Sequence, residues 1–473
     1  MSNHISLHNQ KQLSLFEKKS FRRKSLNYSE NLKELLSEDL DFHEKTSNYA
    51  SHNFHSFPAK FPPQLPKKFI LNLTKPGDIV LDPMMGSGTT ILEAILNNRN
   101  AIGYDIDPLA LKLTSVKTTP LNKVELKKIV NRVISDSLDL VKSNKSYLQK
   151  YYLDYFDENS RKFIDYWFSE DSILELLALM QNISKIEDGS NQRFFDLLFS
   201  AIIITKSGGV SLAFDLGHTR PHRAKVAYGK GGELIFGQKE ILSDNPRIKI
   251  LTKKFKSPIE EFVKKFEQNL SGILSDKNEY VVPQLGFGNA QKLPLLDSSV
   301  DLIVTSPPYA SNAIDYMRAH KFSLVWSGFS IDELSVKRKS YIGSEDTSQF
   351  YFESLPQFTT NIIEEISLLD QRKEKVLKRY YSESHRFLKE MYRVLKPGKA
   401  AIVVVGSSVI RGKDIEIQNC LADIGENIGF KVPKIGIRKL DRNRRMMPAG
   451  KKHDENSSIQ KRMLEEYVIG FLK

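Results

Sequence analysis

Short apolar strands and amphipathic helices alternate in two separate regions of the chain. In the first region the pattern predicts a strand over 79–81, a turn through Gly86 and Gly88, a helix over about 89–97 and a second strand over 101–104. A strand–helix–strand order of this kind predicts parallel strands joined by a right-handed crossover.

The same rhythm returns near the end of the chain. "VDLIVTSPPY" is a strand, and an amphipathic helix, the buried strand "AAIVVVG" and two late strands ("KVPKIGIRKL", "EEYVIGFLK") follow. Between the two regions helical stretches dominate, with one expected hairpin, "KVAYGKGGELIF". The pattern therefore predicts an α/β fold in four parts: a loosely ordered basic N-terminal arm over 1–45, a first α/β half over 46–120, a mainly helical insertion over 121–280 and a second α/β half over 281–473.

Charge and cysteine content narrow the class of protein. Lysine and arginine number 70 against 57 acids, giving a net charge of +13. This surplus points mildly toward a polyanionic partner, although an evenly solvated basic surface also fits. The single cysteine excludes a disulfide framework and a cysteine-rich zinc site. Without an apolar run of membrane-spanning length or a signal-peptide core, we expect a cytoplasmic protein.

The stretch "DPMMGSGTT" places a glycine turn between a strand and a helix N-terminus, where backbone N–H groups favour polar or anionic ligand groups. It lacks the Gly-Lys-Ser/Thr ending of a phosphate-binding loop. Instead Asp82 closes the first strand and Asp105 closes the next, where an acid can accept both hydroxyls of a ribose. A ligand with a ribose, a positively charged amino acid end and no phosphate suits this set, and S-adenosylmethionine is such a ligand. The alternative is a generic turn with acids at the strand ends.

The stretch "TSPPY" ends its strand abruptly, because Pro307 and Pro308 lack N–H groups and fix the backbone. The carbonyls of Ser306 and Pro307 then have no neighbouring strand to bond, and a hydroxyl and the ring of Tyr309 stand beside them. Such a rigid set of acceptors could hold a flat ligand that carries an amino group. The alternative is a proline turn capped by a packed tyrosine.

Together, "DPMMGSGTT", "GYDIDP" and "TSPPY" resemble the amino-methylating (cytosine-N4 or adenine-N6) site-specific DNA methyltransferases of restriction-modification systems. The resemblance implies a seven-stranded, mostly parallel, doubly wound Rossmann-like sheet with an antiparallel hairpin edge and an inserted helical domain. It implies S-adenosylmethionine as cofactor. It also assigns 46–120 to the cofactor-binding half, 121–280 to target recognition and 281–473 to the catalytic half.

The resemblance carries over to individual residues. "HSFPAKFPP" resembles the family's segment over the methionine end of the cofactor, and Asn289 stands in the adenine-contacting loop where the family usually has an acid. The cofactor-binding residues it implies are Phe57, Pro58, Ala59, Lys60, Asp82, Pro83, Met85, Gly86, Gly88, Thr89, Asp105 and Asn289. The catalytic residues it implies are Ser306, Pro307, Pro308 and Tyr309, with the Ser306 side chain and the Pro307 carbonyl as acceptors and Tyr309 stacking on the base.

Basic side chains gather in one glycine-containing loop of the insertion. His218, Arg220, His222 and Arg223 could contact phosphates and guanine edges, although a solvated basic loop fits equally well. We expect no metal site, because no acid or thiol clusters with the histidines at ligand spacing.

The predicted function is methyl transfer to the N4 amino group of cytosine in a specific duplex DNA sequence, by base flipping. Serine before "PPY" is commoner among cytosine-N4 enzymes of the family, and adenine-N6 transfer is the alternative. Carbon methylation would need a thiolate, and Cys420 lies in a helical pattern typical of a core residue. An RNA methyltransferase or a non-catalytic DNA-binding protein on the same fold also remain open. The expected partners are double-stranded DNA and a cognate restriction endonuclease, without a membrane.

Overall fold

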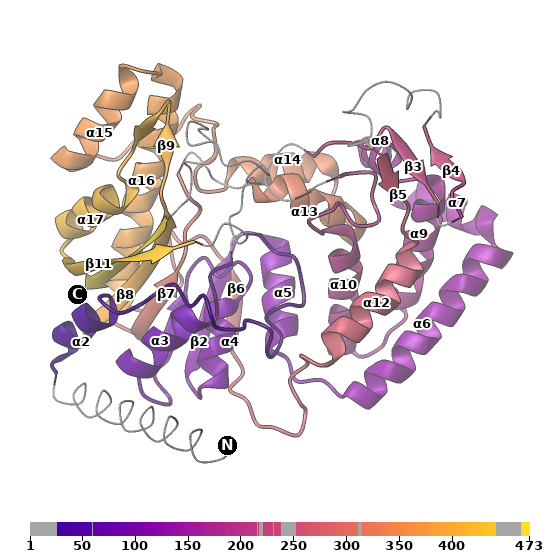
Figure 1. Cartoon of the computed structure of the whole chain (residues 1–473), viewed down its shortest axis with the longest axis horizontal. Helices are drawn as coiled ribbons and strands as arrows, with labels where there is room; N and C mark the ends of the chain where they lie inside the picture. Colours follow the sequence, from indigo (N-terminus) through magenta and orange to yellow (C-terminus); the bar gives the residue numbers. More distant parts are fainter. Residues whose placement is uncertain are drawn as a thin grey trace, which may run out of the picture.

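The computed structural model describes residues 26–58, 60–214, 216, 221–229, 231–237, 252–310, 315–440 and 465–473. Within these ranges a strand-rich part and a helical part lie side by side (Figure 1).

Seven strands form the central sheet. In chain order they are β1 (Ile79–Asp82), β2 (Asn100–Asp105), β6 (Gln284–Phe287), β7 (Val300–Thr305), β8 (Leu395–Gly406), β11 (Lys431–Lys439) and β12 (Glu465–Leu472). In space the order is β11-β12-β8-β7-β1-β2-β6. Neighbouring strands are parallel except that β12 runs antiparallel to both β8 and β11. The predicted doubly wound, mostly parallel sheet with an antiparallel hairpin edge is therefore confirmed.

Helices cover both faces of this sheet. On one face α2 (Tyr28–Leu35), α3 (Gln64–Leu73) and α4 (Thr89–Leu96) pack with Val80 and Val304. On the other face α15 (Gln357–Ser367), α16 (Gln371–Val394) and α17 (Ile417–Ile428) pack with Leu81 and Ile303. Successive side chains of a strand point to opposite faces, so each central strand contributes to two cores and its sequence is apolar throughout.

Helix α2 corrects one expectation about the N-terminus. A loosely ordered arm over 1–45 is wrong for the residues of α2, because Leu32 and Leu35 are fully buried against the sheet. Asn27 begins the helix with a capping box, in which its side chain accepts from the backbone of Glu30 and the Glu30 side chain accepts in return. Residues 1–25 lie outside the described part of the chain.

The helical part is built mainly from the segment between β2 and β6. Its elements are α5 (Pro108–Thr118), α6 (Lys123–Ser143), α7 (Lys145–Tyr155), α8 (Glu158–Trp167), α9 (Glu170–Ser184), α10 (Gly189–Ile203), β3 (Val226–Tyr228), β4 (Leu234–Phe236), β5 (Thr252–Lys254) and α12 (Pro258–Leu270). Strands β3 and β4 pair antiparallel, as the predicted hairpin requires. In the described part of the chain no helix is both long and apolar enough to cross a membrane.

A second segment, which follows β7, joins the same helical core. It contains α13 (Tyr316–Leu324), the 3-10 helix η2 (Val325–Ser327) and α14 (Ile331–Lys339). Met317, Phe322 and Trp326 of this segment are buried in one apolar cluster with α6, α9, α10 and α12. The core of the helical part therefore includes residues that lie beyond 280, the predicted end of the inserted domain. Two short strands, β9 (Val409–Ile410) and β10 (Lys413–Asp414), complete the elements as a separate antiparallel pair.

Candidate active site

A partly open cavity lies where β1, β2 and β7 end, and its empty space, with the solvent at its mouth included, is about 820 Å³. The carboxyl ends of parallel strands are the usual place for a ligand in open α/β sheets. The residues that line the cavity come from four segments of the chain: Phe57, Lys60 and Phe61; Asp82, Pro83, Met84, Met85, Gly86, Ser87 and Thr89; Asp105, Ile106 and Asp107; and Gly288, Asn289, Ala290, Ser306, Pro308, Tyr316, Tyr341 and Ile342 from the second half.

Asp82 joins the end of β1 to the end of β7. Its Oδ1 accepts from the Thr305 hydroxyl at 2.7 Å and from the Met84 backbone N–H at 3.2 Å. Burial raises the pKa of Asp82 to about 6, and these hydrogen bonds oppose the rise. The bond to Thr305 places the residues that follow β7 directly beside this acid.

Asp105 holds the glycine turn against the end of β2. Its two carboxylate oxygens accept from the backbone N–H groups of Gly86, at 2.8 Å, and of Asp107, at 2.9 Å. Burial, and then the neighbouring charge of Asp107, raise the pKa of Asp105 to about 7. The free protein therefore keeps this carboxyl close to half-protonated at neutral pH.

The glycines of the turn are required by its geometry. Gly86 has φ +44° and Gly88, which precedes α4, has φ +70°, both in the left-handed region. A Cβ added to Gly88 would lie 2.5 Å from Oγ1 of Thr114, which makes this position closed to any other residue without a shift of α5.

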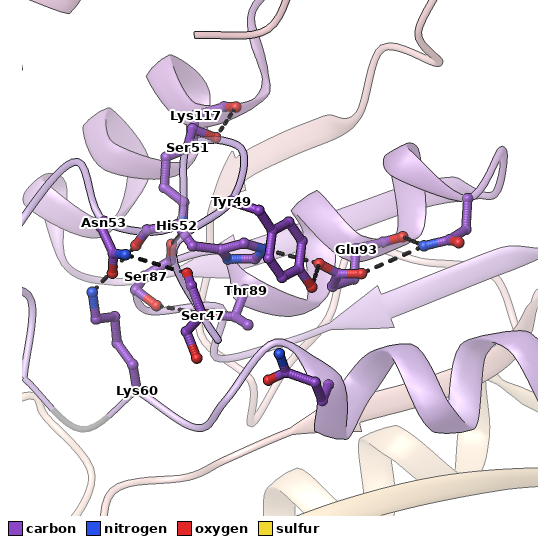
Figure 2. A network of polar contacts seen from close by, with 12 residues as sticks. Ser47, Tyr49, Ser51, His52, Asn53, Lys60, Ser87, Thr89, Glu93 and Lys117 are labelled. Carbon is purple, nitrogen blue, oxygen red and sulfur yellow. Dashed lines mark hydrogen bonds and ion pairs between the residues drawn. The ribbon is translucent and has the colours of Figure 1, made fainter. Parts of the chain in front are cut away.

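The described residues of the 46–61 segment, 46–58 and 60–61, contain no helix or strand and pack beside the turn (Figure 2). The Tyr49 hydroxyl and Nε2 of His52 both contact Oε1 of Glu93 in α4, at 2.6 and 2.8 Å. Glu93 is fully buried, and burial lowers the pKa of His52 to about 4. His52 is therefore a neutral donor to the carboxylate at pH 7, and it anchors the segment that carries Phe57 and Lys60.

Lys117 of α5 binds the backbone of the glycine turn. Its Nζ donates to the Ser87 carbonyl at 2.6 Å, and the Ser51 hydroxyl donates to the Lys117 carbonyl at 2.6 Å (Figure 2). Burial lowers the pKa of Lys117 well below its ordinary value. One side chain thus connects α5, the turn and the 46–61 segment.

Most of the residues expected to bind the cofactor line this cavity. Pro58 and Gly88 do not line it, and Ala59 lies outside the described residues. Asn289 is at the wall, where its side-chain carbonyl already accepts from the Gln291 backbone N–H at 3.0 Å.

Sequence reasoning missed Asp107, Tyr316 and Tyr341. The Asp107 carboxylate accepts from the Leu109 backbone N–H at 2.8 Å and contacts Nδ1 of His320 at 2.5 Å. Burial favours a higher pKa for Asp107, but the contact with His320 outweighs it and the pKa is lowered. The N-cap pattern "DP" is a signal for Asp107. Tyr316 begins α13 and Tyr341 lies just after α14, so both tyrosines come from the part of the chain that follows β7.

The charges of the cavity fit S-adenosylmethionine. Three carboxylates, Asp82, Asp105 and Asp107, and one ammonium, Lys60, are the charged groups among its described lining residues. A polyphosphate would be repelled by this set, whereas a sulfonium and an α-ammonium would be attracted. The buried Tyr341 hydroxyl lies near Asp107 but makes no well-aligned hydrogen bond in the described part of the chain, so it can serve a ligand.

The predicted catalytic residues separate into two environments. Ser306 and Pro308 line the cavity, and the Ser306 hydroxyl donates to the Val404 carbonyl at 3.0 Å. Tyr309 does not line the cavity: it is 7% exposed, its hydroxyl donates to Oε1 of Glu466 at 3.0 Å and its ring faces Gly406. In this conformation Tyr309 is a packed residue, so stacking on a base would require the ring to leave this site.

The predicted DNA-binding residues are described only in part. His218 and Arg220 lie outside the described residues, and His222 is exposed. The guanidinium of Arg223 lies between two rings, 4.3 Å from the centroids of both Tyr166 and Phe236. This stacking holds the charged fork in one orientation near the β3–β4 hairpin.

The chain is similar to several known methyltransferases. A family model for N6 and N4 methyltransferases, described as a DNA methylase, matches residues 6–115. The type II methyltransferase M.MvaI of Kocuria varians is 24% identical over 449 residues, 89% of this chain and 89% of that protein. M.BsoBI of Geobacillus stearothermophilus is 24% identical over 469 residues, 88% and 86% of the two chains. M.MjaII of Methanocaldococcus jannaschii is 30% identical over 201 residues, 39% and 38% of the two chains. These similarities support the predicted resemblance to amino-methyltransferases of the restriction-modification type.

Proposed function

We propose that this chain transfers a methyl group from S-adenosylmethionine to the N4 amino group of cytosine in a specific sequence of duplex DNA. The observation that carries the proposal is the position of Ser306 at the cavity wall with its hydroxyl proton donated to the Val404 carbonyl. The lone pairs of the Ser306 oxygen are then left to accept a hydrogen bond from a substrate amino group.

An exocyclic amino group is a poor nucleophile because its lone pair is delocalised into the ring. Two acceptors that bond its N–H groups draw the nitrogen toward a tetrahedral geometry and make the lone pair available. Ser306 would supply one acceptor and the Pro307 carbonyl the other. The base must leave the duplex to reach them, and the transfer then depends on positioning and charge stabilisation.

Transfer to nitrogen is favoured over transfer to carbon by the state of Cys420. This residue is buried in α17, its thiol lies 3.6 Å from the Ile415 carbonyl and burial raises its pKa to about 12. A thiol of this kind is not a nucleophile at neutral pH. Cytosine is favoured over adenine only by the serine before "PPY", so adenine-N6 transfer is the second candidate.

We propose that the β3–β4 region of the helical part contacts the DNA. Arg223 supports this proposal because its stacked guanidinium presents fixed donors, and such a fork suits a guanine edge or a phosphate. A restriction endonuclease of the same specificity would be the functional partner, as in other restriction-modification systems.

The Ser306→Ala variant tests the role of the serine. We expect methyl transfer to plasmid DNA to fall at least tenfold, because one acceptor for the amino group is lost. Calorimetry should show unchanged affinity for S-adenosylmethionine, since the wall acids remain. Transfer at the wild-type rate would remove Ser306 from the mechanism.

A further inference from the structure

One wall of the cavity belongs to a segment that has no regular structure of its own. Tyr341 and Ile342 line the cavity, and they lie in residues 340–356, which the structure describes throughout without a helix or strand. Backbone that is not held by secondary structure must be held by other contacts if it is to form a defined wall.

A buried ion pair on α16 faces this segment. Arg379 and Glu383 are one helical turn apart, with Nε and Nη2 of the arginine each 3.0 Å from Oε1 of the glutamate. The residues are 6% and 1% exposed. Burying two charges costs hydration free energy, so a buried ion pair adds little net stability to the fold. The presence of this pair therefore suggests a role other than stabilising the protein as a whole.

The pair holds backbone groups on both sides of the cavity-lining residues. Nη2 of Arg379 donates to the Lys339 carbonyl at 3.1 Å, and its Nη1 donates to the Asp346 carbonyl. Oε2 of Glu383 accepts from the Gly343 backbone N–H at 2.8 Å. Three charge-assisted bonds therefore flank Tyr341 and Ile342 along the chain.

The Tyr341 hydroxyl is buried beside the acids of the cavity. Burial, and then the neighbouring Asp107 and Asp105 carboxylates, raise the pKa of Tyr341, and its hydroxyl makes no well-aligned hydrogen bond to another described residue. The backbone that carries Tyr341 therefore contributes to the position of its side chain.

We propose that Arg379 and Glu383 are positioning residues, which fix the Tyr341–Ile342 wall and thereby set the affinity for S-adenosylmethionine. This inference rests on the proposed function, because it takes the cavity as the cofactor site. Neither residue touches the cavity itself, so the effect is transmitted through the backbone bonds at 339, 343 and 346.

The test compares two arginine-to-lysine variants of the same helix. Arg379→Lys keeps the charge but loses the fork that spans two carbonyls, and we expect affinity for S-adenosylmethionine, measured by calorimetry without DNA, to fall at least tenfold. The control is Arg386→Lys. Arg386 bonds Glu353 and the Tyr351 carbonyl, both at 2.6 Å, in the same segment but farther along the chain from the cavity-lining pair. We expect its change in affinity to stay within about threefold.

A double-mutant cycle separates positioning from general stability. The single variant Ile342→Ala should weaken cofactor binding. The double variant that also carries Arg379→Lys should lose less affinity than the product of the two single losses, because both changes act on the same wall of the cavity. The KM for S-adenosylmethionine should rise more than kcat falls in each variant.

The outcomes that overturn the inference are distinct from those that overturn the function. If the wild-type protein does not bind S-adenosylmethionine, the proposed function fails. If it binds, and folded Arg379→Lys binds equally well or Arg386→Lys loses as much, only the positioning role fails. Should Arg379→Lys not fold, Glu383→Gln, which keeps an acceptor for Gly343, takes its place with the same expected loss.

Discussion

The raised pKa of Asp105 predicts that cofactor binding depends steeply on pH. In the free protein this carboxyl has a pKa of about 7, and ribose hydroxyls are best held by the ionised form. For such a pKa the ionised fraction is about 1% at pH 5 and about 50% at pH 7. If only the ionised form binds, Asp105 by itself should raise the association constant for S-adenosylmethionine about fiftyfold over this range. Asp82, with its pKa of about 6, should add a further rise of about tenfold, so the wild-type protein should show a rise of about 500-fold. The amino group of the cofactor, with an ordinary pKa near 8, stays charged throughout.

Asp105→Asn isolates this contribution. The amide does not titrate, so the rise between pH 5 and pH 7 should shrink to about tenfold, the part expected from Asp82 with its pKa of about 6. At pH 7 the variant should bind at least tenfold more weakly, because charge-assisted bonds of roughly 1.5–3 kcal/mol are lost. Calorimetry at several pH values measures both quantities.

The same carboxyl predicts the opposite trend for stability without cofactor. Its folded pKa lies above its unfolded value of 3.8, so the folded protein binds more protons between these values and stability falls as pH rises from 4 to 7. Asp105→Asn should reduce this fall in the melting temperature. A wild-type affinity that is flat with pH, or an equal slope in Asp105→Asn, would refute the reasoning.

Two further predictions concern Gly88 and Tyr309, both of which are closely packed. Gly88→Ala should lower both the melting temperature and cofactor affinity, because φ +70° is strained for alanine and the new Cβ would meet Thr114; Gly77→Ala, at φ +87° with nothing within 4 Å, is the matched control and should retain cofactor affinity. Tyr309→Phe should keep methyl transfer within a few-fold and lose only the bond to Glu466, whereas Tyr309→Ala should lose at least tenfold of transfer while binding the cofactor. Equal loss in both Tyr309 variants would assign the function to the hydroxyl instead of the ring.

The β1–α4–β2 unit could be predicted from the sequence because its determinants are local. The helix predicted over 89–97 is observed as Thr89–Leu96, and both predicted strand-end acids lie at the cavity. The glycines, the strand-end acids and the apolar spacing all lie within one stretch of the chain, so each supports the same structure.

Features that depend on distant contacts could not be predicted. Tyr341 lies on a segment whose backbone α16 bonds at Gly343, and the Tyr309 hydroxyl bonds a partner 157 residues away in β12. Helix α2 has only 8 residues, too few for a convincing period, and its burial depends on the sheet edge that it covers. The apolar pattern of a helix or strand indicates which of its faces is buried. It does not indicate which distant element packs against that face.

The identity of the methylated nucleoside tests the central claim most directly. Plasmid DNA from a methylation-deficient host that expresses the chain would be digested to nucleosides and analysed by mass spectrometry, with the Ser306→Ala variant as control. We predict N4-methylcytosine in the wild-type sample and its loss in the variant. N6-methyladenine would change the base but keep the amino-group mechanism, whereas 5-methylcytosine would contradict the account, because the buried Cys420 is the sole cysteine of the chain.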